Sequence, residues 1–334
     1  MTPPVVEWKL AREPCPALEA PRFGETGFLA GDNFCYHAAP PNLTDEVSHA
    51  EKGCSMLYQK NSLRRIVLPV LKWLSRDIQI RHHFTGDRFR LHSYLHKGYW
   101  YHGRNRERQS LEICQEAIRP GDMVIEVGGH IGYLSLFFSQ LVGELGQVHV
   151  FEPGLNNLPY IEQNIRSQHN ITLVRKAAGN HNGVATFYME NLAGQNNSLV
   201  KDFDGLQKNL QNAFDKGVRI TEAQVEVVRL DDYAAQVGIV PTFVKIDVEG
   251  FEFEVLEGLH ETMSHRPVIF VEVQRQHDRV WEFFESHGYR LFDDDMKSLS
   301  REDVLAIRTQ NVFCFHPETH ASMLSRLMAQ QRAA

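Results

Sequence analysis

One short stretch of this sequence constrains the fold more than any other: Val124-Ile-Glu-Val-Gly-Gly-His-Ile-Gly132. An apolar run that ends in closely spaced glycines predicts a turn between a strand and a helix, as in doubly wound α/β sheets that bind a nucleotide-type cofactor. Glu126 stands just before the glycines, where its carboxylate would repel phosphates placed against the helix N-terminus. The stretch therefore favours a cofactor without phosphate and with a cationic amino-acid end, a description that S-adenosylmethionine fits.

A second carboxylate supports this interpretation. Glu152 ends the apolar run that begins at Gln147, twenty residues after Gly132. Doubly wound folds offer a carboxylate to the ribose hydroxyls at this place. The two acidic positions together predict a methyltransferase that uses S-adenosylmethionine.

The chain from residue 121 onward alternates between apolar strand-like runs and helical stretches, which predicts a mostly parallel sheet with right-handed crossovers. We expect strands at 123–127, 147–151, 171–175, 243–246 and 268–273, and helices at 131–142, 156–167, 252–259 and 279–286. Residues 289–292 and 312–315 predict a closing antiparallel pair. Strand-like pieces at 184–189 and 225–230 flank a polar stretch, 191–217, which we interpret as an inserted lid or substrate loop.

The remainder predicts an accessory region before this domain and one helix after it. Residues 1–60 read as an irregular arm, and 61–120 as a helix over 61–77, a β-hairpin around 85–87 and a helix over 107–118. The catalytic domain is expected over 121–316 and a C-terminal helix over 317–334. The arm and the terminal helix could each support a homodimer.

Composition narrows the class of protein. The chain has 334 residues, 43% hydrophobic residues and a formal net charge of -7, which is typical of a soluble globular protein and argues against a dedicated nucleic-acid binder. Five scattered cysteines are typical of reduced thiols in a cytosolic protein. The first residues lack the pattern of a signal peptide, and no apolar run is long enough for a membrane span. We therefore expect a cytoplasmic protein with no membrane partner.

Several segments together resemble the FkbM family of S-adenosylmethionine-dependent methyltransferases. They are Gly121–Tyr133, Val148–Pro153, Asn164-Ile165, Leu230-Asp-Asp232, Lys245-Ile-Asp-Val-Glu-Gly250 and Pro267–Glu272. The resemblance implies a class I, Rossmann-like methyltransferase fold and methylation of a hydroxyl group, often on a sugar or other secondary metabolite. One motif departs from the family, which usually has Asp and Asn where this chain has Glu126 and His130.

The candidate cofactor residues follow from the motif. Glu126 would accept from the ammonium of the methionine end, and Glu152 from the ribose hydroxyls. His130 would contact the methionine carboxylate or cap the turn, and Asn156 would touch the adenosine or cap the next helix. The small residues of the site would let the backbone approach the cofactor or pass the adenine ring, although they could also serve packing alone; they are Gly128, Gly129, Gly132, Ala177 and Ala178.

The candidate catalytic residues are three carboxylates expected at the carboxyl ends of two strands. Asp247 and Glu249 follow the fourth strand, and Glu272 lies at the end of the fifth. Methyl transfer is an in-line displacement that a general base assists by taking the hydroxyl proton, and Asp247 is the first choice. The alternatives are Mg²⁺ bound at Asp247 and Glu272, or a structural salt-bridge cluster with Lys245.

Two further groups could contact a polyol substrate. Asn197 and Ser198 lie in the polar insertion, where the alternative is a solvated loop. Trp100 and Tyr101 lie in an aromatic, basic stretch, where the alternative is a surface strand with core-facing aromatics. The expected acceptor is a small-molecule hydroxyl. The competing functions are a methyltransferase of RNA or protein and a nucleotide-binding oxidoreductase.

Overall fold

The structure is a computed structural model, and it describes residues 70, 72–201, 203, 219–307 and 310–333. The chain divides into two units, Met1–Arg64 and Arg65–Ala334, and all the described residues belong to the second. The expected arm over 1–60, residues 61–69 and 71 of the expected helix over 61–77, and residues 202 and 204–217 of the insertion lie outside the described residues.

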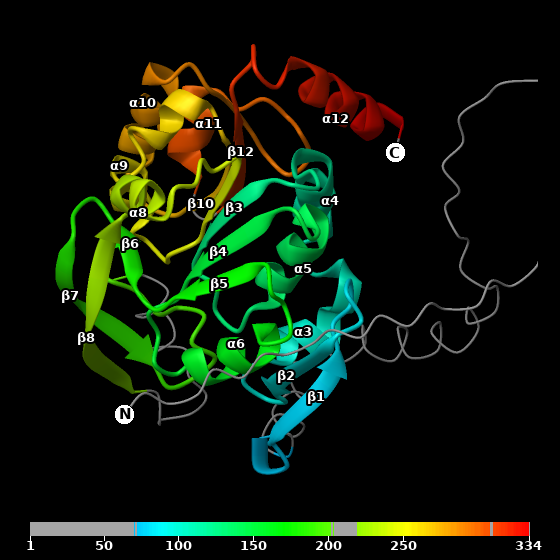
Figure 1. The fold of residues 1–334 in the computed structure, drawn as a ribbon, viewed down its shortest axis with the longest axis vertical. Helices are drawn as coiled ribbons and strands as arrows, with labels where there is room; N and C mark the ends of the chain where they lie inside the picture. Colours follow the sequence, from blue (N-terminus) through cyan, green and yellow to red (C-terminus); the bar gives the residue numbers. More distant parts are fainter. Residues whose placement is uncertain (1–69, 71, 202, 204–218, 308–309, 334) are drawn as a thin grey trace, which may run out of the picture. The chain divides into compact units, whose positions relative to one another are not determined.

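A seven-stranded sheet forms the centre of the second unit (Figure 1). Its order is β11-β12-β10-β9-β3-β4-β5. The strands are β3 (Met123–Val127), β4 (Gln147–Phe151), β5 (Ile171–Val174), β9 (Phe243–Ile246), β10 (Val268–Val273), β11 (Arg290–Phe292) and β12 (Gln310–Phe315). β12 runs antiparallel to both of its neighbours, β10 and β11, and all the other neighbouring pairs of this sheet are parallel. This confirms the predicted doubly wound sheet and its closing antiparallel strand.

Helices cover both faces of the sheet (Figure 1), and each layer encloses its own apolar core. One face carries α8 (Leu230–Val237), α9 (Glu252–Glu257), α10 (His277–Ser286) and α11 (Arg301–Ala306). The other carries α4 (Arg108–Ala117), α5 (Tyr133–Val142), α6 (Leu158–Ile165) and α12 (Ala321–Ala333). Because both faces are covered, the central strands are mostly apolar. The polar exceptions are the positions that belong to the site and, in β4, Gln147 and the buried His149, which bonds to the Tyr233 hydroxyl.

The accessory region packs on α5 and α6. It comprises β1 (Asp77–Arg81), β2 (Arg88–His92), α3 (Lys97–His102) and a short 3₁₀ turn, Gly103–Asn105. The predicted hairpin is confirmed, and the buried Asn164 amide of α6 donates to the carbonyls of both Arg90 in β2 and Ile131 in the glycine-rich turn. The strand considered for the aromatic stretch is wrong, because Lys97–His102 is helical.

A second, three-stranded sheet in the order β6-β8-β7 lies beyond β5. It consists of β6 (Ala177–Gly179), β7 (Gly183–Glu190) and β8 (Ile220–Arg229). The strand-like pieces that flank the insertion are thus confirmed as an antiparallel pair. Sequence patterns missed β6, α8 and α11, each of which is short and has little room for a periodic signal.

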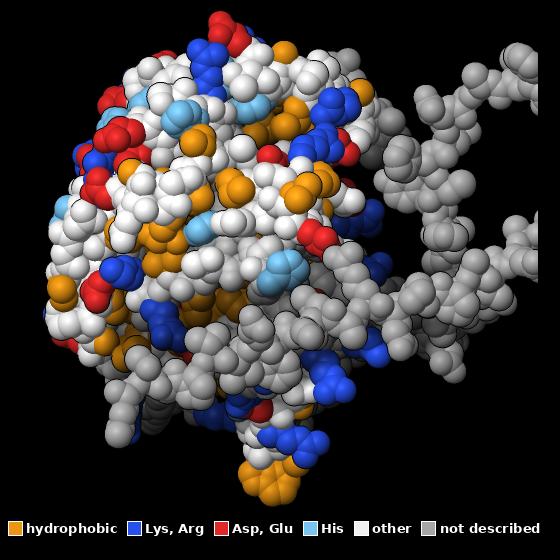
Figure 2. Space-filling view, viewed as in Figure 1, with side chains coloured by type: hydrophobic (Ala, Val, Ile, Leu, Met, Phe, Trp, Pro, Cys, Tyr) orange, Lys and Arg blue, Asp and Glu red, His pale blue; other side chains and the backbone are white. Residues whose placement is uncertain are grey.

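Acidic and basic side chains are mixed over the upper part of the face in Figure 2, whereas Lys and Arg predominate at its lower end, around β1 and β2.

No helix among the described residues has the length and apolar character needed to span a bilayer.

Asp231, in the Leu-Asp-Asp segment, joins α8 to the turn after α9. Its buried carboxylate accepts from the backbone amides of Glu261 and Thr262, both at 2.9 Å, and from the Thr262 hydroxyl at 2.7 Å. Arg229 forms an ion pair with it at 2.8 Å. The neighbouring Asp232 is 46% exposed and bonds only to surface groups. The first aspartate of this segment therefore has a structural role.

We expect Asp231→Ala to lower the free energy of unfolding by about 3 kcal/mol, because it leaves buried donors without partners. Asp232→Ala should cost less than about 1 kcal/mol, as is usual for exposed pairs. Urea unfolding of the two variants compares these values directly. Equal losses in both would contradict the structural role of Asp231.

Candidate active site

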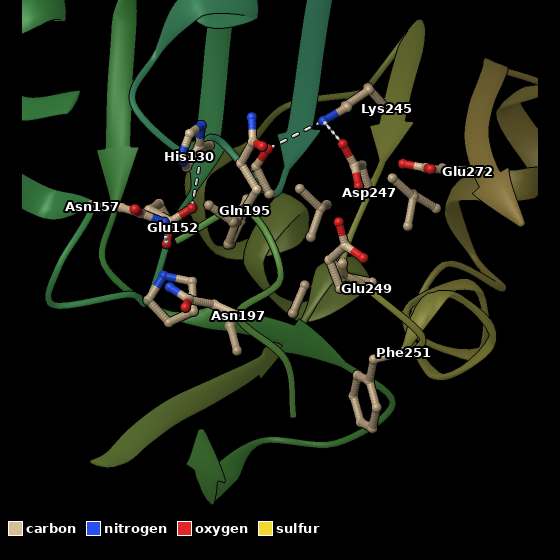
Figure 3. Close-up of a pocket in the computed structure, with 18 of the residues that line it drawn as sticks. His130, Glu152, Asn157, Gln195, Asn197, Lys245, Asp247, Glu249, Phe251 and Glu272 are labelled. Atoms are coloured by element: carbon tan, nitrogen blue, oxygen red, sulfur yellow. Dashed lines mark hydrogen bonds and ion pairs between the residues drawn. The ribbon is translucent and has the colours of Figure 1, made fainter. Parts of the chain in front are cut away.

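A cavity of about 340 Å³ opens at the carboxyl ends of β3, β4 and β9, where the order of the sheet reverses. His130, Glu152 and Asn157 lie on one side of it, and Asp247, Glu249 and Glu272 on the other (Figure 3). The carboxyl ends of parallel strands meet at one edge, so residues far apart in sequence come together here. Ligands of open α/β sheets bind at this place.

The glycines of the turn are required by neighbouring protein atoms. Gly128 has φ +87°, and a Cβ there would lie 1.8 Å from the Asp247 carbonyl oxygen. A Cβ on Gly129 would lie 2.3 Å from a methyl group of Val150. Gly132, with φ +85°, packs against Ile161 and does not line either cavity of the site. Of the three glycines, Gly128 alone lines the main cavity. Close packing against Ile161 and the positive φ account for Gly132 without any ligand.

Glu152 fastens the turn and also lines the cavity. One carboxylate oxygen accepts from the His130 amide at 2.7 Å, and the other from the Gly154 amide at 2.8 Å and from the Asn157 side chain at 3.3 Å. Burial raises the pKa of Glu152 to about 7, although these hydrogen bonds oppose the shift. Each carboxylate oxygen has more than one lone pair, so ribose hydroxyls could still donate to it.

Glu126 lies behind the turn, away from the main cavity. Its buried carboxylate accepts from the Ser135 hydroxyl at 2.5 Å and lines a smaller cavity of about 50 Å³, together with Arg106 and Lys245. It pairs with Lys245 in the register of β3 and β9. Burial raises the pKa of Glu126 to about 7 against the opposing charge of Lys245.

His130 has both ring nitrogens occupied. The Tyr99 hydroxyl lies 2.8 Å from Nδ1, and the carbonyl of Ala193 lies 2.7 Å from Nε2. The carbonyl can only accept, so Nε2 carries the proton and Nδ1 accepts from Tyr99. Burial lowers the pKa of His130 to about 3, so the ring is neutral. In this arrangement the imidazole holds the chain over the cavity and has no donor left for a methionine carboxylate.

The segment over the cavity, residues 193–197, is also held by asparagines. Asn157 donates to the Gly194 carbonyl at 3.1 Å, and Asn197 donates to the Asn156 side chain at 2.8 Å. Asn156 in turn donates to the Glu190 carbonyl at 3.1 Å. Neither Asn156 nor Asn157 caps α6 with its side chain. Asn156 does not line the cavity, whereas Asn157 and Asn197 do.

One end of the cavity is apolar. Ala177 and Ala178 of β6 line it together with Phe187 and Phe251. The short alanine side chains occupy little of the space at this end. This end fits the adenine ring that the sequence predicted for Ala177 and Ala178.

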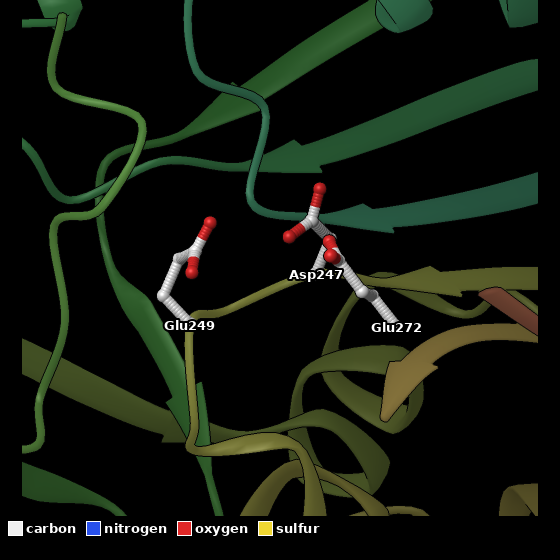
Figure 4. A group of neighbouring side chains, drawn as sticks. All are labelled: Asp247, Glu249 and Glu272. Carbon is white, nitrogen blue, oxygen red and sulfur yellow. The ribbon is translucent and has the colours of Figure 1, made fainter. Parts of the chain in front are cut away.

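The three predicted carboxylates meet at the other end. Glu272 reaches toward Asp247 from β10, and Glu249 faces them from the turn after β9 (Figure 4). One oxygen from each lies within 4.8 Å of the others. Burial and the charges of its two neighbours raise the pKa of Glu272 to about 10. The pKa of Glu249 is also raised well above its usual value, by burial and by Asp247.

Lys245 makes the pKa of Asp247 differ from those of its two acidic neighbours, Glu249 and Glu272. Its buried ammonium donates to Asp247 at 3.0 Å and to the Gly128 carbonyl at 3.1 Å. Burial alone would raise the pKa of Asp247, but the charge and hydrogen bond of Lys245 and a hydrogen bond with Glu272 together outweigh burial, and the net shift is downward. Asp247 is therefore ionised at neutral pH, while Glu272 keeps its proton.

The structure places one of the four predicted substrate residues in the cavity lining and the other three outside it. Ser198 is buried outside the cavity lining and donates to the Glu249 carbonyl at 2.7 Å. Trp100 donates to the Ser93 carbonyl, and its neighbour Tyr101 packs against it. Neither lines the cavity; Tyr99, on the other side of α3, does. Only Asn197 of the four lies in the lining.

Some lining residues were not predicted, among them Glu107, Phe251 and Asn311. Tyr99 and Arg106 were included only as members of the aromatic, basic stretch, and Gln195 only as part of the polar insertion. The signal for Tyr99 was its place in the aromatic stretch. Alternation along a strand would have placed Tyr99 and Tyr101 on the same face, whereas this segment is a helix. Asn311 lies on the antiparallel strand β12, and no local pattern connects it to the glycine-rich turn.

The family described as methyltransferase FkbM domain matches residues 126–291. A comparison with the sequences of curated proteins finds no match. Among solved structures, the chain is similar to a precorrin-6y C5,15-methyltransferase from Geobacter metallireducens, with 14% identity, 63% of this chain and 88% of that chain covered, and a TM-score of 0.36.

Two more solved structures are similar. An S-adenosylmethionine-dependent O-methyltransferase from Thermotoga maritima has 10% identity, with 63% of this chain and 64% of that chain covered and a TM-score of 0.35. Aeropyrum pernix fibrillarin with natively bound S-adenosylmethionine has 8% identity, with 72% and 88% covered and a TM-score of 0.38.

The neutral state of His130 predicts a pH-dependent stability. An unfolded histidine binds a proton near pH 6.5, whereas folded His130 does so only near pH 3. Between these values the unfolded state holds more protons, so stability falls as the pH falls, by about 1.4 kcal/mol per unit for this group.

Asn is well suited to the positive φ of position 130 and does not titrate. The stability deficit of His130→Asn should therefore shrink by about 1.4 kcal/mol per unit below pH 6. Urea unfolding between pH 7 and 4.5 measures it, with His169→Asn in an exposed loop as the control. A deficit that stays constant with pH would contradict this interpretation.

Proposed function

We propose, on the premise that this chain belongs to the FkbM family of S-adenosylmethionine-dependent methyltransferases and has their class I fold, that it methylates a hydroxyl group of a small polyol such as a sugar. The observation that carries the proposal is the ionised Asp247 beside two protonated carboxyls at the end of the cofactor cavity.

The cavity lining fits the donor. When bound, S-adenosylmethionine supplies an electrophilic methyl group on a sulfonium. The apolar slot at Ala177 and Ala178 suits the adenine, and Glu152 suits the ribose hydroxyls. The ionised Asp247 favours a cationic ligand nearby. These features support the donor from this chain's own residues.

The acceptor end is rich in groups that accept hydrogen bonds. Asp247, Glu272, Glu107 and the Asn311 side chain all line the cavity there. A polyol offers several O–H donors to such a surface, whereas an apolar acceptor would leave the carboxyls without partners at a cost. This favours a hydroxyl-bearing acceptor over an apolar one.

Asp247 is the member of the trio suited to take the proton. It is ionised, and one-third of its side chain is exposed, toward the cavity that it lines. As the acceptor oxygen bonds to carbon, its proton passes to the Asp247 carboxylate. Glu272 is protonated in the same state and donates to Asp247, which keeps that carboxylate oriented. Lys245 holds it from the other side at 3.0 Å.

Asp247→Asn should lower kcat by about 10²- to 10⁴-fold, the usual contribution of a general base. The assay follows release of S-adenosylhomocysteine against a panel of sugars, glycosylated metabolites and carboxylates, with RNA and protein as further arms. Asp232→Asn at the surface is the control. A wild-type rate in Asp247→Asn would exclude it as the base, and turnover with RNA or protein alone would replace the polyol proposal.

The same cluster predicts the response to metal removal. Lys245 balances the charge of Asp247, and burial raises the pKa values of Glu249 and Glu272, so the trio carries less negative charge than three ionised carboxylates would. We expect dialysis against EDTA to leave kcat unchanged and added Mg²⁺ to have no effect. A loss of activity that Mg²⁺ restores would instead support the magnesium site considered for Asp247 and Glu272.

A further inference from the structure

Arg106 lies where the two cavities of the site meet. It follows the short 3₁₀ turn after α3 and lines both the main cavity and the smaller one behind the glycine-rich turn. Its neighbours in both linings include Gly128 and His130, the residues of the turn itself. A guanidinium at this position can reach whatever group a ligand places against the turn.

The guanidinium is held flat and points its charge into the site. It stacks over the Tyr99 ring with 4.5 Å from Cζ to the ring centroid. Its Nε forms an ion pair with Glu107 at 3.1 Å, and the side chain is 26% exposed. Tyr99 is itself fixed by its bond to His130. The Tyr99 ring is therefore a fixed platform for the guanidinium, and the cation is positioned before any ligand arrives.

Among the described residues, Glu107 is the one ion-pair partner of Arg106, and it uses Nε. The Nη1 and Nη2 atoms have no hydrogen-bond acceptor in the described part of the chain. Nη1 lies close to the backbone of Gly98, where a Cβ would approach it to 2.8 Å. The forked end of the guanidinium is the part that binds carboxylates in a bidentate manner.

The other polar groups near the turn are less suited to an anion. The Lys245 ammonium uses two of its three donors on Asp247 and the Gly128 carbonyl. The His130 ring is neutral and donates to Ala193. Glu126 and Glu107 would repel an anion. Among these groups, Arg106 is thus the cation that retains a pair of donors for a carboxylate.

We propose that Arg106 binds a carboxylate of the ligand that lies against the glycine-rich turn, with Tyr99 as its platform. The carboxylate has two possible sources, the methionine end of the methyl donor and an acid group on the acceptor. The inference rests on the proposed function, since both molecules belong to that reaction. It transfers to Arg106 the carboxylate contact that the sequence had suggested for His130.

Calorimetric titration with S-adenosylmethionine and with its decarboxylated analogue tests the donor source without any turnover. Arg106→Gln should weaken binding of S-adenosylmethionine by about 10- to 100-fold, as expected for a lost charge-assisted pair, and leave the decarboxylated analogue nearly unaffected. Arg106→Lys should recover only part of the loss, because an ammonium lacks the fork. Arg104→Gln is the matched control, since Arg104 bonds to the His83 carbonyl and does not line the cavity.

The acceptor source has its own arm. D-glucuronate and D-glucose are titrated into the protein saturated with S-adenosylhomocysteine. If Arg106→Gln leaves both donor forms unaffected but weakens glucuronate and not glucose, the carboxylate belongs to the acceptor. Equal losses for the intact and decarboxylated donor, or no loss with any probe, would overturn the proposal.

Gly98→Ala provides a second variant that keeps the charge. The new methyl group would meet Nη1 and displace the fork, while Ala favours the helix at that position. Weakening of the same ligand as in Arg106→Gln, with an unchanged melting temperature, would support the proposal. Because these readouts measure binding, they remain informative even if the protein methylates no polyol.

Discussion

The Lys245 ammonium, buried between the Asp247 carboxylate and the Gly128 carbonyl, is the interaction on which the rest of the site depends. It joins the end of β9 to the glycine-rich turn after β3, the two strands between which the sheet reverses. The two segments approach so closely that a Cβ at position 128 would lie 1.8 Å from the Asp247 carbonyl oxygen, so this position must be glycine. One buried cation thus connects the chain geometry of the turn to the charge of Asp247, the proposed general base.

Burial gives this charge arrangement its effect. In water, three carboxylates at such distances would simply be ionised and repel one another weakly. Inside the cavity, loss of solvent makes each additional negative charge costly, so the trio divides into one carboxylate paired with Lys245 and two carboxyls that keep their protons. Asp247 is the member of the trio that stays ionised because it is the carboxylate that bonds to the Lys245 ammonium. The same burial keeps His130 neutral, which lets it bond to Tyr99 and Ala193 together.

Much of the fold was accessible from periodicity and glycine placement. The five parallel strands from β3 to β10 were predicted because fully covered strands are continuous apolar runs bounded by turn residues. Short elements such as β6, α8 and α11 were missed, because eight residues or fewer carry little periodic signal. The aromatic stretch of α3 was considered as a strand, since six residues of Tyr, Trp and His suit a pleated surface as well as a short helix.

The sequence by itself determined which charged residues occupy the carboxyl ends of the strands, because strand alternation and glycine turns are local properties of the chain. It therefore identified Glu152, Asp247, Glu249 and Glu272 before their geometry was known. Only the tertiary structure decided that Glu126 lies behind the turn and that Ser198 supports the site from outside its lining. It also decided that Trp100 bonds to Ser93 away from the lining, whereas Tyr99 and Arg106 line the site. The reason is physical: a side chain's partners across space, and hence its charge state and free donors, depend on packing between segments whose sequence spacing carries no information about their contact.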